Sequence, residues 1–189
     1  GAGSRQLRNR QLPVEMIGEK IMEYTIRPAE PRDAGDISAL RRMPGVFETI
    51  LGNPGESRKK TEDMLAGLGP NDFMFVAVAC DDAGGERGIG SISLKVNANP
   101  RTRHAAGIGL MVRRDFQNQG IGRAMLEKVL DLADNWLMLI RLELTVFADN
   151  ERAVHLYESL GFEREGIRRK AAVRNGVYMD EIAMARIRE

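Results

Sequence analysis

Two glycines stand where an amphipathic helix is expected to begin. In the segment QNQGIG they are Gly120 and Gly122. Glycine is about 1 kcal/mol worse than alanine inside a helix, so its presence here needs a reason. Backbone N–H groups at a helix start have no partner within the helix, and the helix dipole favours an anion there. Glycines let a bulky group approach that backbone, so the segment predicts a cradle for a phosphate or pyrophosphate.

This segment differs from two common phosphate motifs. No Lys-Ser or Lys-Thr pair follows Gly122, so it is not a P-loop, and the third glycine of the dinucleotide fingerprint G-x-G-x-x-G is missing. The lack of a phosphate-binding lysine and a magnesium ligand disfavours phosphoryl transfer. The plain alternative is a strand-to-helix turn whose glycines serve packing alone.

Hydrophobic periodicity predicts the strands and helices that must position this segment. Strands are expected at residues 23–29, 72–80, 87–96, 104–112 and 139–147, with two more after residue 162 joined by the hairpin signal Asn175-Gly176. Helices are expected at residues 31–43, 57–69, 121–136 and 149–162, the third with Trp136 on its apolar face. The segment 43–57 is expected as a loop with short helical pieces. The order β-α-α-β-β-β-α-β-α-β-β indicates an α/β domain with mixed strand directions.

Length and composition limit the possible functions. A chain of 189 residues suits one domain with one core, and a net charge of +1 gives no field that would attract nucleic acid or a membrane surface. No apolar run approaches the ~20 residues of a membrane span. Cys80 is the only cysteine, which excludes an internal disulfide, disfavours a cysteine metal site and fits a reducing cytoplasm; we expect a buried, inert thiol and no metal. Residues 1–22 are expected to be an N-terminal extension, a cloning remnant or a solvated arm, ahead of a domain at 23–189.

Two motifs, in this order, resemble those of the GNAT superfamily of N-acetyltransferases. The first is Gln117-x-x-Gly120-x-Gly122 after a strand ending in GLMV. The second is LTVFADNERAVHLYESLGF, where an Asn follows a strand and a helix ends in Tyr-x-x-x-Gly-Phe. The resemblance runs from about Tyr24 to Arg188. The segments RTRHAA, DNWL, RLELTVFADN, RNGVYMD and MAR are similar to those of bacterial L-amino acid N-acetyltransferases.

The resemblance implies a fold and a cofactor site. The fold would be a mixed, mostly antiparallel twisted sheet with helices on both faces and two central parallel strands, at 108–112 and 142–147, splayed around acetyl-CoA. The cofactor would contact backbone groups of Leu110, Met111 and Val112, the pyrophosphate cradle Gln117, Asn118, Gln119, Gly120, Ile121, Gly122 and Arg123, and the arm-binding residues Asn150, Ala153 and Tyr157. Asn150 is also a favourable helix cap.

Tyr157 has two interpretations. Its helical spacing with Ala153, Leu156 and Leu160 is typical of a core tyrosine. In the enzymes it resembles, a tyrosine here protonates the leaving thiolate, and a phenol with a pKa near 10 can donate to a thiol of pKa about 8.5. No serine or cysteine has the surroundings of a covalent nucleophile, so the acetyl group would pass directly to the acceptor amine.

The sequence identifies the general base and the acceptor pocket less clearly than it identifies the cofactor site. One candidate base is His104, because histidine is a residue type that can exchange protons under physiological conditions and this one precedes the expected cofactor strand. The other candidate is Glu143, in the adjacent strand. The alternatives are a surface histidine and a carboxylate paired with arginine. The pocket is expected from the loop 43–51 and the last hairpin. The residues considered for it are Arg42 or Arg174 for an acceptor carboxylate, Glu48 or Asp180 for its amine, and Tyr178.

Three functions remain open from the sequence. The first is acetyl transfer from acetyl-CoA to the amine of a small molecule, and the favoured acceptor is an L-amino acid. The second is the same chemistry on a protein N-terminus, a lysine or an aminoglycoside. The third is a CoA-binding module without turnover. The resemblance also implies a homodimer.

Overall fold

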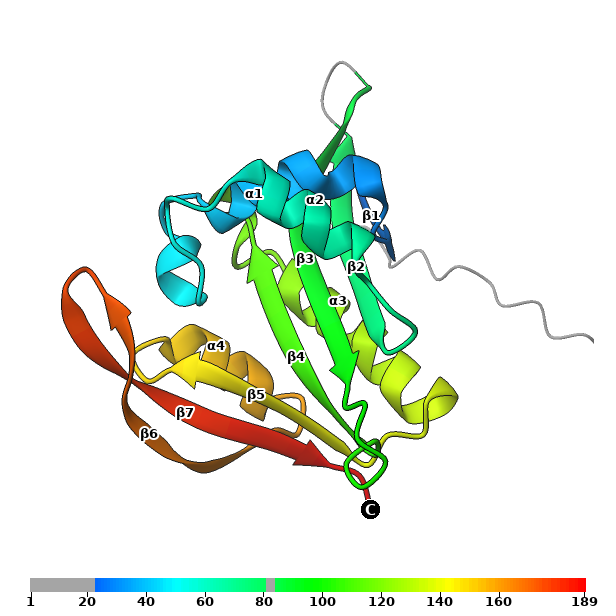
Figure 1. Cartoon of the computed structure of the whole chain (residues 1–189), viewed down its shortest axis with the longest axis vertical. Helices are drawn as coiled ribbons and strands as arrows, with labels where there is room; N and C mark the ends of the chain where they lie inside the picture. Colours follow the sequence, from blue (N-terminus) through cyan, green and yellow to red (C-terminus); the bar gives the residue numbers. More distant parts are fainter. Residues whose placement is uncertain (1–22, 81–83) are drawn as a thin grey trace, which may run out of the picture.

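The computed structural model describes residues 23–80 and 84–189, in which the strands form one sheet in the order β1-β2-β3-β4-β5-β7-β6 (Figure 1). The strands are β1 (Tyr24–Pro28), β2 (Asp72–Cys80), β3 (Glu86–Val96), β4 (Ala105–Val112), β5 (Arg141–Phe147), β6 (Glu163–Arg174) and β7 (Val177–Ile187). The helices are α1 (Ala34–Arg41), α2 (Arg58–Ala66), α3 (Ile121–Asp131) and α4 (Glu151–Glu158). The predicted order of elements is confirmed. The predicted extension, residues 1–22, lies outside the described residues.

The two central strands are parallel and separate along their length. β4 pairs with β5 only from Ala105↔Arg141 to Gly107↔Glu143, whereas β5 stays paired with β7 from Arg141 to Phe147. All the other neighbouring strands pair antiparallel. Figure 1 shows the resulting V between β4 and β5. The predicted mixed sheet with a splayed parallel pair is therefore confirmed.

Helices cover both faces of the sheet, as predicted. Strand side chains alternate between faces, so Val76 and Val78 of β2 pack with α1 and α2, while Ala77 and Ala79 pack on the side of α3 and α4. The α3 residues Met125, Leu126 and Val129 are fully buried. Burial of each such side chain contributes roughly 1.5–3 kcal/mol relative to exposure. This packing holds the start of α3 against β4.

The predictions for Trp136 and Cys80 are wrong. The α-helix ends at Asp131 and continues as a π-helical turn over Leu132–Trp136, closed by the Leu137 N–H donating to the Leu132 carbonyl at 3.0 Å. The wider turn rotates later residues off the apolar stripe, and Trp136 is 73% exposed. Cys80 is the last residue of β2, beyond the core, and is also exposed.

The last hairpin forms where the sequence predicts it. Asn175 and Gly176 both have positive φ, 50° and 77°, as the tight turn of a β-hairpin requires. The segment after α1 contains a short 3₁₀ turn at Phe47–Thr49, which confirms the predicted loop with helical pieces. Among the described helices, none is both long and apolar enough to span a membrane.

Candidate active site

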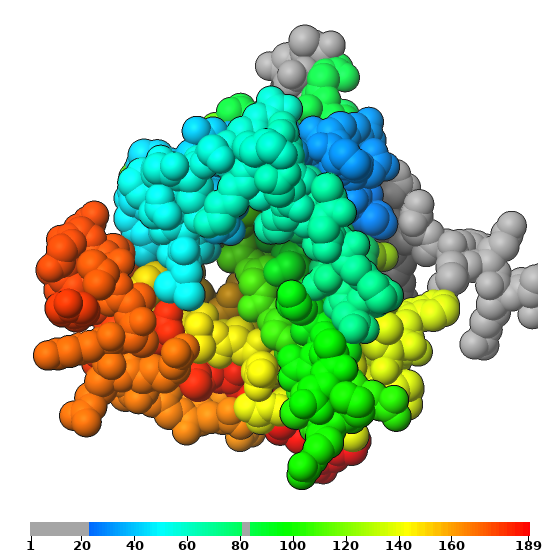
Figure 2. Space-filling view, in the orientation of Figure 1, coloured from blue at the N-terminus to red at the C-terminus, as the bar shows by residue number. Residues whose placement is uncertain are grey.

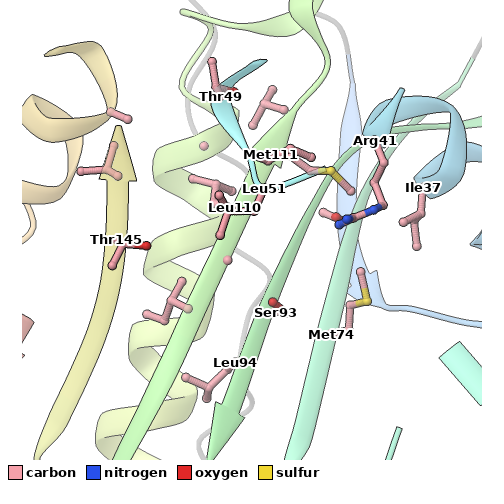
Figure 3. A pocket seen from close by; sticks show the side chains of 18 of the residues that line it. Ile37, Arg41, Thr49, Leu51, Met74, Ser93, Leu94, Leu110, Met111 and Thr145 are labelled. Atoms are coloured by element: carbon pink, nitrogen blue, oxygen red, sulfur yellow. The ribbon is translucent and has the colours of Figure 1, made fainter. Parts of the chain in front are cut away.

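A cavity of about 940 Å³ occupies the gap where β4 and β5 part. Figure 2 shows the hollow, bordered by the segment that joins α1 to α2 and by the β5–β7 part of the sheet. In Figure 3, Thr145 of β5 turns its hydroxyl toward β4, which carries Leu110 and Met111. Leu51, from the segment between α1 and α2, lies near the two β4 side chains. The separation of the two strands therefore creates a partly open space that reaches both faces of the sheet.

The start of α3 opens onto this cavity. Gly120 is the helix N-cap with φ 79°, a left-handed conformation that glycine adopts without strain, and it provides no side-chain cap. The amides of the first turn therefore have no partner within the helix. A Cβ built at Gly120 would have no atom within 4 Å, so the backbone is open on that side. Gln117, Asn118, Gly120, Gly122 and Arg123 line the cavity, and this arrangement can bind a phosphate group.

Other residues of the predicted cradle have additional partners. The Gln119 side chain donates to the Asp115 carbonyl at 3.0 Å and lies outside the cavity lining. Ile121 is 3% exposed and packs its side chain into the core. Arg123 donates to Ser159 Oγ at 2.6 Å, so its guanidinium is partly occupied. Only the backbone amides of Gln119 and Ile121 remain for a phosphate.

Backbone groups of β4 face the gap at alternate residues. The Arg113 N–H donates to the Ile89 carbonyl at 2.8 Å, and the Asn97 N–H donates to the Ala105 carbonyl at 3.0 Å. By antiparallel alternation, Met111 pairs its backbone with β3, while Leu110 and Val112 turn theirs toward β5. The Val112 carbonyl accepts a hydrogen bond from Gln117 Nε2 at 2.9 Å. Leu110 and the Val112 amide are thus the groups of the predicted trio that could pair with a ligand, and Met111 contributes its side chain.

Tyr157 lines the cavity from α4. Asn150 caps this helix, its Oδ1 accepting from the Ala153 N–H at 3.3 Å, and Asn150 and Ala153 both line the cavity. Burial raises the pKa of Tyr157 to about 12. Its hydroxyl has no hydrogen-bond partner among the described residues, so it is available to a group in the cavity. A protonated phenol in this place can donate a proton.

The two predicted bases lie outside the lining of the large cavity. His104 is exposed just before β4, and its carbonyl accepts from the Arg141 N–H at 3.1 Å at the closed end of the V. At ~3.3 Å per residue, six residues of strand separate it from Leu110 by roughly 20 Å. Glu143 accepts from Arg141 Nε at 2.9 Å and lines a smaller neighbouring cavity rather than the large one. The structure brings neither side chain to the large cavity.

None of the five predicted acceptor residues lines the large cavity. Arg42 Nε donates to the Ser38 carbonyl at 3.1 Å, and Glu48 accepts from the Gly45 N–H at 2.6 Å. Asp180 accepts from the Lys170 N–H at 2.8 Å, and Tyr178 is 67% exposed.

Arg174 is the most heavily engaged of these five residues. It bonds the Glu48 carbonyl at 3.2 Å and the Asp149 carboxylate, and its guanidinium lies 5.1 Å from the Phe147 ring centroid. Arg174 thus ties the last hairpin to the segment after α1.

Sequence reasoning missed several charged residues that do line the cavity, and two of them are Arg41 and Glu181. Each is one position from a predicted residue, Arg42 or Asp180. The alternation of β7, with Ile182 and Met184 in the core, was the signal that could have placed Glu181 on the other face. The further polar lining residues include Thr145, Ser91 and Ser93.

Arg41 is held in place by a buried carboxylate. Its Nε lies 2.7 Å from Oε2 of Glu56, a side chain only 5% exposed, and Lys60 Nζ lies 2.7 Å from Oε1. The hydrogen bond from Arg41, supported by Lys60, lowers the pKa of Glu56 to about 2. Figure 3 shows Arg41 reaching from α1 toward the sheet. The pair fixes a cation at the cavity wall.

Comparison with known proteins places this architecture in one family. The model of the Acetyltransferase (GNAT) family matches residues 44–162. The chain is 36% identical over 166 residues to the L-amino acid N-acetyltransferase AaaT of Escherichia coli, covering 88% of this chain and 99% of that protein. It is 33% identical over 111 residues to the ribosomal protein bS18-alanine N-acetyltransferase of Salmonella typhimurium, covering 53% and 74%.

Solved structures agree with this family. The spermidine N-acetyltransferase of Vibrio cholerae in complex with CoA and spermine superposes with a TM-score of 0.74 at 26% identity, covering 87% of this chain and 95% of that one. A GNAT-family acetyltransferase of Streptococcus pneumoniae gives a TM-score of 0.72 at 26% identity, covering 87% and 99%.

The sheet opened between two parallel strands, with a helix start beside the opening, defines the class of N-acetyltransferases. The chain belongs to the acetyltransferase (GNAT) family and is an N-acetyltransferase. The resemblance predicted from its two motifs is confirmed.

Proposed function

We propose that this enzyme transfers the acetyl group of acetyl-CoA directly to the primary amine of a small molecule, an L-amino acid. The observation that carries the proposal is the cavity in the β4–β5 gap, which joins the open start of α3 to the hydroxyl-bearing side chain of Tyr157. The likeness to an L-amino acid N-acetyltransferase over 88% of the chain supports the acceptor class.

The residues present fit acetyl-CoA. The first-turn amides of α3, exposed by the left-handed Gly120, would hold the pyrophosphate. Leu110 and the Val112 amide would pair with the pantetheine arm, and Asn150 and Ala153 would border it. When bound, acetyl-CoA would supply an acetyl group activated as a thioester.

The residues of this chain would then position the acceptor amine and protonate the leaving thiolate. The residues on both sides of the gap would hold the acceptor amine close to the thioester. The reaction between two separate molecules then becomes an effectively unimolecular step. Tyr157 keeps its proton at neutral pH because its pKa is about 12, and it would donate that proton to the departing thiolate. The acceptor amine would attack in its neutral form and release one proton to solvent as the amide forms, and the tyrosine would take a proton back from solvent. No side chain of this chain becomes acetylated in this scheme.

A larger acceptor is the second candidate. A smaller cavity of about 460 Å³ shares Ser93, Gly109 and Thr145 with the large one, so a long acceptor could extend along the sheet. The relatives that act on spermidine and on the alanine of a ribosomal protein keep a polyamine and a protein N-terminus among the acceptors to test.

The test is a thiol-release assay with acetyl-CoA against the twenty amino acids, spermidine, an aminoglycoside and a short Ala-initiated peptide. The proposal expects release with one or a few amino acids and an N-acetyl product by mass spectrometry. Release with the peptide or spermidine alone would replace the amino acid as acceptor. Tight acetyl-CoA binding without any turnover would favour a binding module, and no binding would refute the cradle.

We also propose that the enzyme is a homodimer, as the family resemblance implies, and that it is cytoplasmic, as its single cysteine suggests. Sedimentation velocity at micromolar concentration should give twice the mass of the 21.0 kDa chain. A monomer that turns over amines normally would contradict the dimer and leave the acetyl-transfer proposal standing.

A further inference from the structure

Glu181 is a buried carboxylate that nothing in the proposed transfer has used. It is 3% exposed, lies on β7 and lines the large cavity. We propose that Glu181 binds the acceptor amine in the ammonium form in which it arrives, before that nitrogen loses to solvent the proton that prevents its attack on the thioester. This would make Glu181 a determinant of specificity for cationic primary amines. The inference rests on the proposed function and adds the residue that selects the acceptor.

The register of the sheet places Glu181 beside the gap. It is the cross-strand partner of Phe147, the last residue of β5, and both side chains line the cavity. Neighbouring strands lie ~4.8 Å apart, so Glu181 is one strand from the edge of the gap. Two residues along, Thr145 pairs with the small Ala183 on the same face. This face is opposite to the core of α3 and α4, from which Tyr157 enters.

The charges around Glu181 leave room for a cation. Arg168 Nη1 donates to Glu181 Oε2 at 3.0 Å, and this arginine side chain is 59% exposed. Within residues 23–80 and 84–189, no other hydrogen bond to the Glu181 carboxylate is present. A carboxylate this buried is costly unless its charge is compensated. An ammonium at Oε1 would give it a second charge-assisted bond.

A purely structural role is the alternative. Arg168 and Glu181 pair across β6 and β7 immediately before a register shift, so the ion pair could serve only to fix the hairpin. Substitutions that change either the size or the charge of Glu181 distinguish the binding role from the structural role. Glutamine keeps the size of Glu181 but removes its charge, whereas aspartate keeps the charge on a shorter side chain.

The experiment compares Glu181→Gln and Glu181→Asp with the unaltered enzyme. The acceptor is the amino acid that it acetylates fastest, or spermidine if no amino acid reacts. We expect Glu181→Gln to lower kcat/KM for the acceptor roughly 10- to 100-fold, the loss of a hydrogen bond to a charged group. The loss should appear mainly as a higher acceptor KM, with the Kd for acetyl-CoA unchanged by calorimetry. Glu181→Asp should retain more activity than Glu181→Gln.

Two control variants separate the outcomes. Arg168→Gln removes the hairpin ion pair, and Glu163→Gln makes the same chemical change at an exposed position of β6. Both should keep the acceptor KM within about threefold. A loss in Arg168→Gln equal to that in Glu181→Gln, or a glutamine variant more active than the aspartate variant, would overturn the inference. If the unaltered enzyme acetylates no amine at all, the proposed function fails first, and this inference fails with it.

Discussion

The ring of Phe162 lies against the ring of Tyr157, with centroids 5.8 Å apart and planes inclined by 59°. Phe162 is 2% exposed and belongs to the core that α3 and α4 share with the sheet. Such a tilted aromatic contact is worth about 0.5–1.5 kcal/mol beyond area burial, so it fixes the tyrosine ring. The core thereby holds the hydroxyl at the cavity rather than leaving it to a mobile side chain.

Replacing Tyr157 by Phe should separate chemistry from packing. Phenylalanine keeps the contact with Phe162 but removes the proton donor, so kcat should fall roughly 10²- to 10⁴-fold. The Kd for acetyl-CoA and the melting temperature should stay close to their original values. Tyr24→Phe, on β1, is the matched control and should keep full kcat. Unchanged kcat in Tyr157→Phe would exclude this residue as the donor.

The ionisation of Tyr157 should occur far above the usual range. Burial raises its pKa from 10.0 to about 12. Because the folded pKa is raised, the neutral phenol contributes stability that is complete below pH 10 and is lost as the pH rises toward 12. The tyrosinate absorbance that disappears in Tyr157→Phe should therefore form near pH 12, measured as a difference titration. Ionisation of this residue near pH 10 would contradict a buried phenol.

Substitution of Gly120 by Ala should weaken acetyl-CoA binding. A left-handed conformation costs a residue with a Cβ roughly 1–2 kcal/mol, and the added methyl would stand at the open backbone of the cradle. Gly176→Ala is matched, because Gly176 also has positive φ and open space around its Cβ position, but lies in the β6–β7 turn. Both variants should lose similar stability by urea unfolding, and only Gly120→Ala should raise the Kd for acetyl-CoA. Equal Kd values would remove Gly120 from the binding site.

Replacing Glu56 by Gln should destabilise the protein at neutral pH. The carboxylate receives hydrogen bonds from Arg41 and Lys60, and the loss of such charged bonds costs roughly 1.5–3 kcal/mol. The Glu56 pKa is lowered from 4.5 to about 2, so this stabilisation is complete above pH 4.5 and disappears as the pH falls toward 2. Urea unfolding at several pH values should show the difference between variant and parent shrinking across that window.

Glu62→Gln is the control for Glu56→Gln, because Glu62 makes an exposed pair with Arg58 on the same helix. Exposed pairs of this kind contribute about 0–1 kcal/mol. A Glu56→Gln loss no larger than that of Glu62→Gln would show that the buried pair with Arg41 is unimportant for stability.

Local features of the sequence were sufficient to predict much of the fold. Periods of two and of 3.6 residues identify the strands and helices, because each period reflects how side chains leave the backbone. The turn at Asn175-Gly176 and the helix start at Gly120 depend on φ values that few residues adopt, so residue type alone marks them. The same local chemistry identified Asn150 as a helix cap. The motifs built on these features also indicated the family.

Which charged residues line the cavity could be learned only from the tertiary structure. On β7, a shift of one position turns a side chain to the other face, so Glu181 lines the cavity while the neighbouring Asp180 bonds Lys170. On α1, one position is a rotation of about 100°, which separates Arg41 from Arg42. Periodicity shows which residues share one face of a strand or helix. It does not show which other elements cover that face. That choice is made by strand order and by the elements that pack on each side.

The sequence by itself determined which segments form strands and helices, where the glycine turn at the start of α3 lies and to which family the chain belongs. The tertiary structure decided which charged groups meet. His104 precedes β4 but lies at the closed end of the V, because the chain passes the length of β4 before reaching the gap. Glu181 is 24 residues beyond Tyr157 in the chain, yet both line one cavity because β7 pairs with β5. Local propensity cannot supply such distances, since they arise only when the sheet is assembled.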